Sequence, residues 1–342
     1  MFINIGILFG GRSYEHDISI ISASSVYYAL KDFHNIYPLY INKEGSLCIT
    51  KEIDTKSFVN EKKFRHFEFI NKGIKISYKK IKLDVIISCM HGINGEDGLA
   101  YSISNLYNIA YVGSPLIPSA LCIDKYYTHL VLKNNQIKSL SSKCVFKKNG
   151  INNLSYPVIF KPARLGSSIG VIVIKNDEDL KNLLPKVFYY DDKVVIQKYY
   201  ENFREYNQAI YRGKNGLVLS KVEEVIKGDE ILSFDDKYIE KSSNKLFIDD
   251  EKIINKISEI SKKIYEILEL EGIVRIDYMH IDGEIYVNEI NTTPGSLAYY
   301  LFNDSFINIL EDLIYVAIRN KLNEKDTTFD SSILSLDYHY KK

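Results

Sequence analysis

The first strand of the chain constrains its fold more than any other stretch. Residues 3–9 form an apolar run rich in β-branched side chains, with Asn4 as its one polar member, and Gly10 and Gly11 end it. Such a run is typical of a parallel strand that is buried on both faces and enters a loop. A helix over residues 18–30 and an apolar strand over residues 36–41 complete a predicted βαβ unit. The expected buried face of this helix comprises Ile18, Ile21, Ser25, Val26, Ala29 and Leu30.

An open parallel sheet is predicted to extend over residues 1–115. Residues 84–90 form another apolar run, which leads into a loop at 91–98 and a helical pattern over 99–106. Residues 51–82 carry many charges and have weak periodicity, so we interpret them as a peripheral connection. The chain should therefore begin with an α/β domain.

Beyond residue 120 the pattern changes to α+β. Helices are predicted over residues 126–134, 178–187, 251–270 and 305–321, and strands over residues 158–161, 171–174 and 194–198. Residues 274–280 and 284–290 alternate around Asp282 and Gly283, the strongest short signal for a hairpin turn. The predicted division is a central lobe at 116–192, a C-terminal lobe at 193–325, and a polar tail at 326–342 that the chemistry does not need.

Charge and cysteine spacing exclude several function classes. Lys plus Arg and Asp plus Glu both number 44, so no excess of positive charge favours a nucleic-acid partner. The four cysteines are scattered, which fits neither a zinc site nor a disulfide framework. Gly10, Gly11 and Arg12 interrupt the apolar start too early for a signal peptide or a membrane span. We therefore expect a cytoplasmic protein with no nucleic-acid or membrane partner.

The predicted C-terminal hairpin brings four polar side chains together. Because side chains alternate along a strand, Arg275 and Asp277 share one face, and Glu289 and Asn291 share the same face of the neighbouring strand. The oxygens of Asp277, Glu289 and Asn291 are hard ligands of the kind that Mg²⁺ takes when it also binds phosphates. An exposed hairpin with cross-strand salt bridges is the alternative interpretation.

A glycine-rich loop follows the strand predicted at 158–161. Glycines and small hydroxyls over residues 162–170 let backbone N–H groups approach phosphate oxygens, and Lys161 supplies a positive charge. The loop lacks the Gly-Lys-Ser/Thr of a Walker motif and the spacing of a dinucleotide-binding motif. A simple glycine hairpin turn is the alternative.

Taken together, the motifs resemble those of the D-alanine:D-alanine ligase family within the ATP-grasp superfamily. The matching stretches, in the order of that family, are residues 10–19, 91–98, 124–125, 161–170, 236–238, 275–277 and 289–295. The resemblance covers nearly the whole chain, and the joint occurrence is far more specific than any single motif. It implies an N-terminal substrate-binding α/β domain followed by a two-lobed ATP-grasp fold.

The resemblance also implies a reaction. Two D-alanine molecules would be joined through a D-alanyl phosphate intermediate, with release of ADP and phosphate, for peptidoglycan precursor synthesis. ATP and Mg²⁺ or Mn²⁺, with two ions in the site, are the implied cofactors, and a homodimer is the implied assembly. The metal ligands would be Asp277, Glu289 and Asn291.

Roles of individual residues follow from the same resemblance. Glu15 would bind the ammonium of the first D-alanine, and His91 would lie near its carboxylate. Ser167 and Tyr238 would form a hydrogen-bonded set with Glu15, which ties the glycine-rich loop to a mobile loop over the site. That loop, carrying Lys237 and Tyr238, would act as a lid that excludes water. The residues implied to contact nucleotide are Lys125, Lys161 and Ser168 near the phosphates, Gln197, Lys198 and Tyr199 near adenine, and Glu205 at the ribose.

Arg275 and the Gly295 backbone N–H would stabilise negative charge during the reaction. The second substrate depends on the segment after Gly295, where the family has a longer loop that ends in Ser-Leu. Here Ser296 and Leu297 follow at once. If the loop is simply shortened, Ser296 takes the role of that serine; if not, the acceptor differs.

Two further departures concern the nucleotide. Gln197 stands where the family usually has glutamate, and residues 203–205 lack the usual glycine before Glu205. Two alternatives stay open at this point: a ligase of the same fold with D-serine, D-lactate or another amino acid as acceptor, and a nucleotide-binding protein without catalysis.

Overall fold

The structure is a computed structural model that describes residues 2–58, 64–149, 151, 153–226 and 246–325. Four sheets are built from these residues, with six, four, five and three strands. Every helix in these ranges is too short or too polar to span a lipid bilayer.

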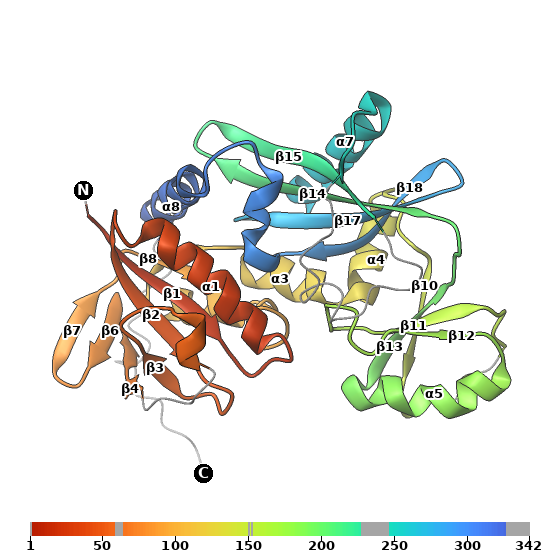
Figure 1. The fold of residues 1–342 in the computed structure, drawn as a ribbon, viewed down its shortest axis with the longest axis horizontal. Helices are drawn as coiled ribbons and strands as arrows, with labels where there is room; N and C mark the ends of the chain where they lie inside the picture. The colour runs from red at the N-terminus through yellow and green to blue at the C-terminus, as the bar shows by residue number, and fades with distance from the viewer. Residues whose placement is uncertain (1, 59–63, 150, 152, 227–245, 326–342) are drawn as a thin grey trace, which may run out of the picture.

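The six-stranded sheet forms the N-terminal domain, in the order β4-β3-β2-β1-β8-β9. Strands β1 (Asn4–Gly10), β2 (Asn35–Ile41), β8 (Val85–Ser88) and β9 (Ala110–Val112) are parallel, and β3 (Leu47–Ile49) and β4 (Arg65–His66) add an antiparallel edge. Helices α1 (His16–Leu30) and α2 (Leu99–Leu106) belong to this domain, and the C-terminal helix α8 (Phe306–Leu322) returns to pack on it (Figure 1). The predicted βαβ opening is confirmed.

The buried face of α1 differs from the predicted one. Ile21 is 48% exposed, and the helix turns Ser19, Ser22 and Ala23 toward the core together with Val26. The predicted face was therefore right at Ile18, Val26 and Leu30 and wrong at Ile21, because small side chains let the helix backbone approach the sheet closely.

Residues 51–82 are more than a connection. After a short 3-10 helix, η1 (Thr55–Phe58), strands β5 (Glu68–Ile70), β6 (Gly73–Ile76) and β7 (Lys79–Lys82) form an antiparallel sheet. Its buried side chains, Phe69, Ile74 and Ile81, pack on the N-terminal domain together with Phe67, which precedes β5. The prediction failed because exposed lysines on β7 hide a short period-2 pattern.

The central lobe is an antiparallel sheet in the order β10-β13-β11-β12. Its strands are β10 (Ser142–Phe146), β11 (Val158–Pro162), β12 (Ile172–Ile174) and β13 (Lys193–Lys198). Helix α5 (Asp177–Tyr190) covers one face, where Val187 and Phe188 join the apolar core of the lobe. The other face is free to form the wall of a cavity.

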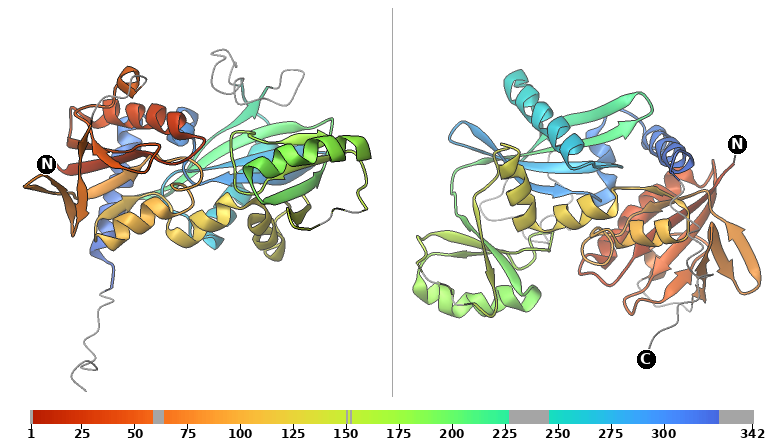
Figure 2. Two further views of the ribbon diagram at one scale, coloured as in Figure 1. Left: turned by 90° about the horizontal axis from the view of Figure 1, so that it is seen from below. Right: turned by 180° about the vertical axis from the view of Figure 1, so that it is seen from behind.

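The C-terminal sheet has the order β16-β15-β14-β17-β18. Its strands are β14 (Arg204–Gly213), β15 (Gly216–Val225), β16 (Leu246–Phe247), β17 (Val274–Ile281) and β18 (Glu284–Asn291). The amphipathic helix α7 (Glu251–Ile267) packs on it, and α3 (Leu116–Ile123) and α4 (Lys125–Asn134) lie against it as seen from behind (Figure 2). Asp282 (φ 51°) and Gly283 (φ 79°) make the predicted tight turn between β17 and β18.

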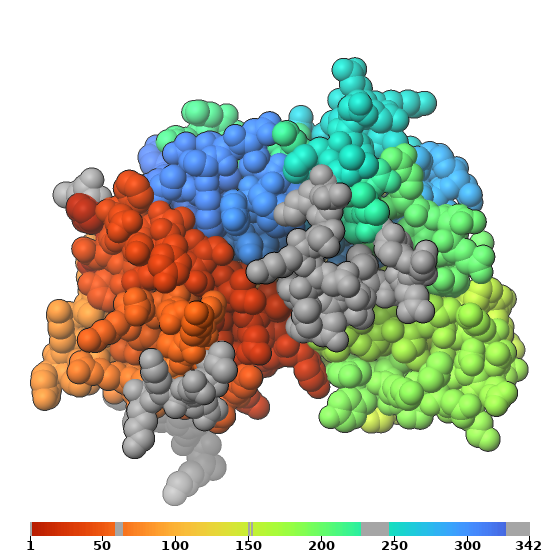
Figure 3. All heavy atoms as spheres, viewed as in Figure 1, coloured from red at the N-terminus to blue at the C-terminus, as the bar shows by residue number. Residues whose placement is uncertain are grey.

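The N-terminal domain and the central lobe meet the C-terminal part on two different sides. On the face drawn in Figure 3, the red N-terminal domain and the green central lobe are separate masses at the lower edge, and both adjoin the blue C-terminal segments. The last 3-10 segment, η2 (Gly295–Leu301), lies where β18 returns toward α1.

Candidate active site

A cavity of about 730 Å³ lies between the central sheet and the C-terminal sheet. Strands β11 and β13 form one wall, and β17 and β18 form another. Small-molecule sites usually enclose roughly 300–1,000 Å³, so the space suits a nucleotide-sized ligand. The residues predicted to contact nucleotide or metal that line it are Lys125, Lys161, Ser168, Gln197, Lys198, Tyr199, Glu205 and Glu289.

Two lysines bring positive charge to one end of this cavity. The Lys125 ammonium donates to the backbone carbonyl of Leu165 and lies 3.7 Å from the Glu289 carboxylate. The Lys161 ammonium donates to Asn288 Oδ1 over 3.2 Å. Because both lysines are next to β18, an anion held between them would also lie near Glu289.

The glycine-rich loop between β11 and β12 reaches from the cavity to the N-terminal domain. Ser167 (φ 54°), Ser168 (φ 59°) and Gly170 (φ 72°) adopt left-handed backbone conformations, which turn the loop sharply. The Ser167 hydroxyl donates to Glu15 Oε1, and a Cβ on Gly166 would lie 3.3 Å from both oxygens of that carboxylate. Residues 152 positions apart thus make direct contact.

The β17–β18 hairpin has the predicted arrangement. Arg275 pairs with Asn291 and Asp277 with Glu289 across the two strands. The Arg275 guanidinium donates two hydrogen bonds to Asp277, at 2.7 and 2.8 Å, and Asn291 Nδ2 donates a third at 3.1 Å. Burial disfavours the charge of Arg275, but the Asp277 carboxylate outweighs it and raises the pKa of the guanidinium well above its ordinary value.

The oxygen donors of this hairpin fit Mg²⁺ only together with a ligand. Among the described residues, no group of three His, Cys, Asp or Glu side chains could hold a metal ion by itself. Asp277 and Glu289 supply two carboxylates and Asn291 an amide oxygen, so phosphate and water oxygens would have to complete a coordination shell. The set therefore suits an ion that binds with a nucleotide.

A chain of three hydrogen bonds encloses the segment after β18. The His91 ring contacts the Thr293 carbonyl through Nδ1 (2.7 Å) and the Ser22 hydroxyl through Nε2 (2.8 Å), and Ser22 Oγ accepts from the Ser296 N–H (2.9 Å). Because a carbonyl only accepts, Nδ1 carries the proton and Nε2 accepts from Ser22. Burial lowers the pKa of His91, which favours this neutral form.

Glu96 holds the same segment from the other side. Its carboxylate accepts from the Thr293 N–H at 3.0 Å and from the Gly92 N–H at 3.2 Å. Burial, together with the charge of Glu15, raises the pKa of Glu96 to about 7. The backbone carbonyl and the backbone N–H of Thr293 are therefore both bound by residues of the 91–98 loop.

The segment that they hold is a tight left-handed turn. Ser296, Leu297 and Ala298 have φ values of 49°, 51° and 48°, a conformation that side chains other than glycine rarely adopt in succession. The Leu297 N–H donates to the Pro294 carbonyl, and the Leu297 side chain is buried in the core. Apart from its two chain neighbours, no described residue has an atom within 4 Å of the position that a Cβ on Gly295 would take, so there is space at this point.

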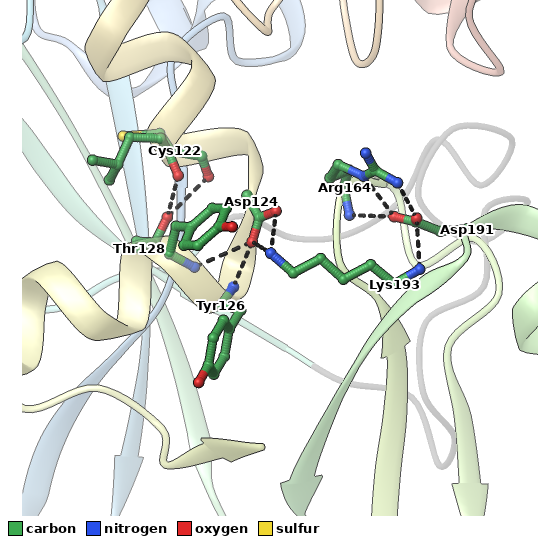
Figure 4. A network of polar contacts seen from close by, with 9 residues as sticks. Cys122, Asp124, Tyr126, Thr128, Arg164, Asp191 and Lys193 are labelled. Carbon is green, nitrogen blue, oxygen red and sulfur yellow. Dashed lines mark hydrogen bonds and ion pairs between the residues drawn. The ribbon is translucent and has the colours of Figure 1, made fainter. Parts of the chain in front are cut away.

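A buried ionic network ties the start of α4 to the glycine-rich loop (Figure 4). Asp124 caps α4, and it accepts from the Lys193 ammonium at 2.6 and 2.8 Å. Asp191 binds both the backbone N–H and the guanidinium of Arg164, and it accepts from the Lys193 backbone N–H. The network therefore fixes Lys125, the residue after the cap, relative to the loop.

Two family models cover most of the chain. Residues 4–114 match the model described as "D-ala D-ala ligase N-terminus", and residues 125–309 match "D-ala D-ala ligase C-terminus". The chain belongs to the D-alanine–D-alanine ligase family. Membership confirms both the predicted resemblance and the predicted fold, an N-terminal α/β domain followed by two ATP-grasp lobes.

Relatives in the D-alanine–D-alanine ligase family match this chain over nearly its full length. The D-alanine–D-alanine ligase of Thermosipho melanesiensis is 36% identical, with 98% of this chain and 99% of the relative covered. That of Campylobacter jejuni is 34% identical, covering 94% and 96%. The crystal structure of the enzyme from Helicobacter pylori superposes with a TM-score of 0.79 at 32% identity, covering 92% and 98%. The VanG D-Ala:D-Ser ligase from Enterococcus faecalis gives 0.77 at 26%, covering 93% and 100%.

Not every predicted site residue can be placed. Lys237 and Tyr238, and the polar tail at 326–342, lie outside the described residues. Sequence reasoning missed Glu96 and Ser22 as parts of the site. The available signal for Ser22 was a small polar residue among the apolar residues of the predicted helix. The available signal for Glu96 was an acidic residue inside the 91–98 motif.

Proposed function

We propose that this chain is an ATP-dependent D-alanine–D-alanine ligase that forms D-alanyl-D-alanine for peptidoglycan precursor synthesis. The observation that carries the proposal is the Glu15–Ser167 hydrogen bond, because it joins the N-terminal domain to the loop at the end of the nucleotide-sized cavity. A site for a small acid beside a site for ATP is what acyl phosphate formation requires.

In the first step, a carboxylate oxygen of D-alanine attacks the terminal phosphorus of ATP, and the bond to ADP breaks. Lys125 and Lys161 bind the phosphate oxygens, with Ser168 beside them and Glu205 at the ribose. Gln197, Lys198 and Tyr199 surround the base. Glu15 binds the ammonium of the first D-alanine, and Ser167 holds Glu15 in place.

In the second step, the amine of the other D-alanine attacks the acyl carbon, loses a proton and displaces phosphate. Arg275 and the Gly295 N–H stabilise the negative charge that develops on the oxygen. Ser296 and Leu297 belong to the acceptor side; since the Leu297 side chain is buried, the contacts there fall to Ser296 and to the backbone. His91 acts beside the first substrate by holding the turn, because protein groups occupy both ring nitrogens.

Metal binding, the lid and the assembly are parts of the same proposal. Asp277, Glu289 and Asn291 would hold Mg²⁺ or Mn²⁺, two ions when nucleotide is bound, which neutralise phosphate charge. Lys237 and Tyr238 would close over the site.

A homodimer is proposed from the family resemblance alone. The free thiols of Cys48, Cys89, Cys122 and Cys144 support a reducing, cytoplasmic location. The proposed domain boundaries lie at residues 115, 192 and 325.

The test is phosphate release by the purified chain with Mg²⁺, ATP and D-alanine, with mass detection of the product. Formation of D-alanyl-D-alanine is expected. Separate reactions with D-serine or D-lactate as second substrate test the alternative acceptors. Product with one of these but not with D-alanine would show that the second substrate is a different one and that the proposed reaction type is correct. Phosphate release that is not stimulated by D-alanine, alone or with D-serine or D-lactate, would contradict the proposal as a whole.

A further inference from the structure

One buried polar atom in the wall of the cavity lacks a partner. Within the described part of the chain, no group donates a hydrogen bond to Gln197 Oε1. The Gln197 side chain is only 6% exposed, and the residue lines the cavity. A buried amide oxygen without a donor is unfavourable unless a ligand supplies one.

The orientation of this amide follows from its neighbour. Ser142 lies opposite Gln197 across β10 and β13, and the two side chains are linked at 2.8 Å. The Ser142 hydroxyl donates its single proton to the Leu140 carbonyl at 2.9 Å. While it makes that bond, Ser142 can only accept from Gln197.

The amide must then present its NH₂ group to Ser142. In the flipped orientation, the Ser142 hydroxyl would have to turn its proton to Gln197 Oε1 and would lose its bond to the Leu140 carbonyl. The flipped arrangement therefore has one hydrogen bond fewer. The Ser142 hydroxyl consequently fixes Oε1 as the atom left for a ligand.

The position of Gln197 places this acceptor at the base end of the cavity. Gln197 pairs with Ile159 on β11, two residues before Lys161, and both residues line the cavity. Lys161 points to the end where Glu289 lies. A nucleotide whose phosphates lie at the lysines would therefore extend its base toward β10 and Gln197.

We infer that Ser142 is a positioning residue for nucleotide specificity: it locks the Gln197 amide so that the cavity selects a purine with an amino group at position 6 over one with a 6-oxo group. The inference rests on the proposed nucleotide site. Adenine offers a donor at position 6, which satisfies Gln197 Oε1. Hypoxanthine and guanine offer an acceptor there, which leaves Oε1 facing another oxygen.

Calorimetric binding of ADP and IDP to the whole chain with Mg²⁺ tests this without any turnover. The two ligands differ at position 6 of the base and in the protonation of the adjacent ring nitrogen. Wild type should bind ADP more tightly by on the order of 10- to 100-fold, the usual effect of one mismatched buried hydrogen bond. Ser142→Ala frees the amide to turn, so the ratio of the two affinities should fall toward one.

Two further variants make the result specific. Ser141→Ala is the matched control, because Ser141 is the exposed neighbour of Ser142 and should leave the ratio unchanged. Gln197→Met removes the amide at similar length and should abolish the preference even if Ser142→Ala folds poorly. A Ser142→Ala protein that keeps the wild-type ratio, or a wild type that binds ADP and IDP equally, overturns the inference. Failure of the wild type to bind either nucleotide would instead overturn the proposed nucleotide site.

Discussion

The Glu96 carboxylate accepts a hydrogen bond from the backbone N–H of Thr293, 197 residues away, at 3.0 Å. This contact joins a loop of the N-terminal domain to the segment that follows β18. His91, from the same loop, binds the carbonyl of Thr293. The geometry after Gly295 is therefore set by the N-terminal domain, although the residues belong to the C-terminal lobe.

Glu96 should make the stability of the fold depend on pH. Burial and the Glu15 charge raise its pKa from 4.5 to about 7. The folded state therefore holds this proton more tightly than the unfolded state, and stability falls as pH rises through that interval. Above pH 7, ionisation of Glu96 should lower the free energy of unfolding by its full amount, about 3 kcal/mol. Urea unfolding between about pH 4 and about pH 8 measures it.

Glu96→Gln should remove that dependence. The free energy of unfolding of the variant, relative to wild type, is expected to improve as pH rises. Ligation should fall because glutamine has a single acceptor oxygen and cannot accept from both the Thr293 and the Gly92 N–H. Glu44→Gln, at an exposed position, serves as the control and should follow wild type. Parallel pH profiles for Glu96→Gln and wild type would contradict the role of burial at Glu96.

Glu289→Gln should weaken metal binding at the hairpin. A neutral amide replaces one of two carboxylates, so we expect turnover to fall by about 100-fold or more and half-maximal activity to need more Mg²⁺. Rates of phosphate release over a Mg²⁺ titration measure both effects. Glu284→Gln is the control on the same strand, because Glu284 pairs only with exposed Lys138 and Lys256 in the described structure. Unchanged Mg²⁺ dependence in Glu289→Gln would contradict the assignment of Glu289 as a metal ligand.

Ser22→Ala should loosen the turn at Ser296. The change removes the acceptor of the Ser296 N–H and the donor to His91. Two lost hydrogen bonds of about 1 kcal/mol each should raise the KM of the acceptor D-alanine by roughly tenfold or more. The KM of ATP should stay near the wild-type value. Ser25→Ala on the same helix, where the hydroxyl donates to the Ile21 carbonyl within α1, should change neither constant. Equal increases in both KM values would show that Ser22 acts on the whole fold.

Lys193→Met should destabilise the protein by about 3–5 kcal/mol, because Asp124 is left buried without its counter-charge. The double variant Asp124→Asn/Lys193→Met should regain most of this loss, since Asn also caps a helix well. Thermal or urea unfolding of the three proteins measures the difference. A double variant no more stable than Lys193→Met would show that the ion pair is not the source of the effect.

Local signals predicted the parts of this fold where pattern and environment agree. The Asp282-Gly283 turn and the pairing of Asp277 with Glu289 follow from period-2 alternation and turn chemistry alone. Helix α2 ends where the periodicity ends. Strands β14 and β15 were missed because polar and apolar residues are mixed along both of them.

Relationships between distant segments could not be predicted in the same way. Nothing local to Ser22 indicates that its hydroxyl meets His91, 69 residues later. Likewise, the orientation of the Gln197 amide depends on Ser142, on a strand that the sequence pattern did not predict. Such contacts arise from the packing of whole lobes, so only the structure reveals them.

The turn over Ser296, Leu297 and Ala298 has no spare length. Three successive left-handed residues are bound by Ser22 at one end and anchored by a buried leucine in the middle, so an inserted residue would break at least one of these contacts. In evolutionary terms, a lineage that keeps this short turn can exchange the side chains around it, whereas a lineage with the longer loop of the family has to anchor that loop in another way.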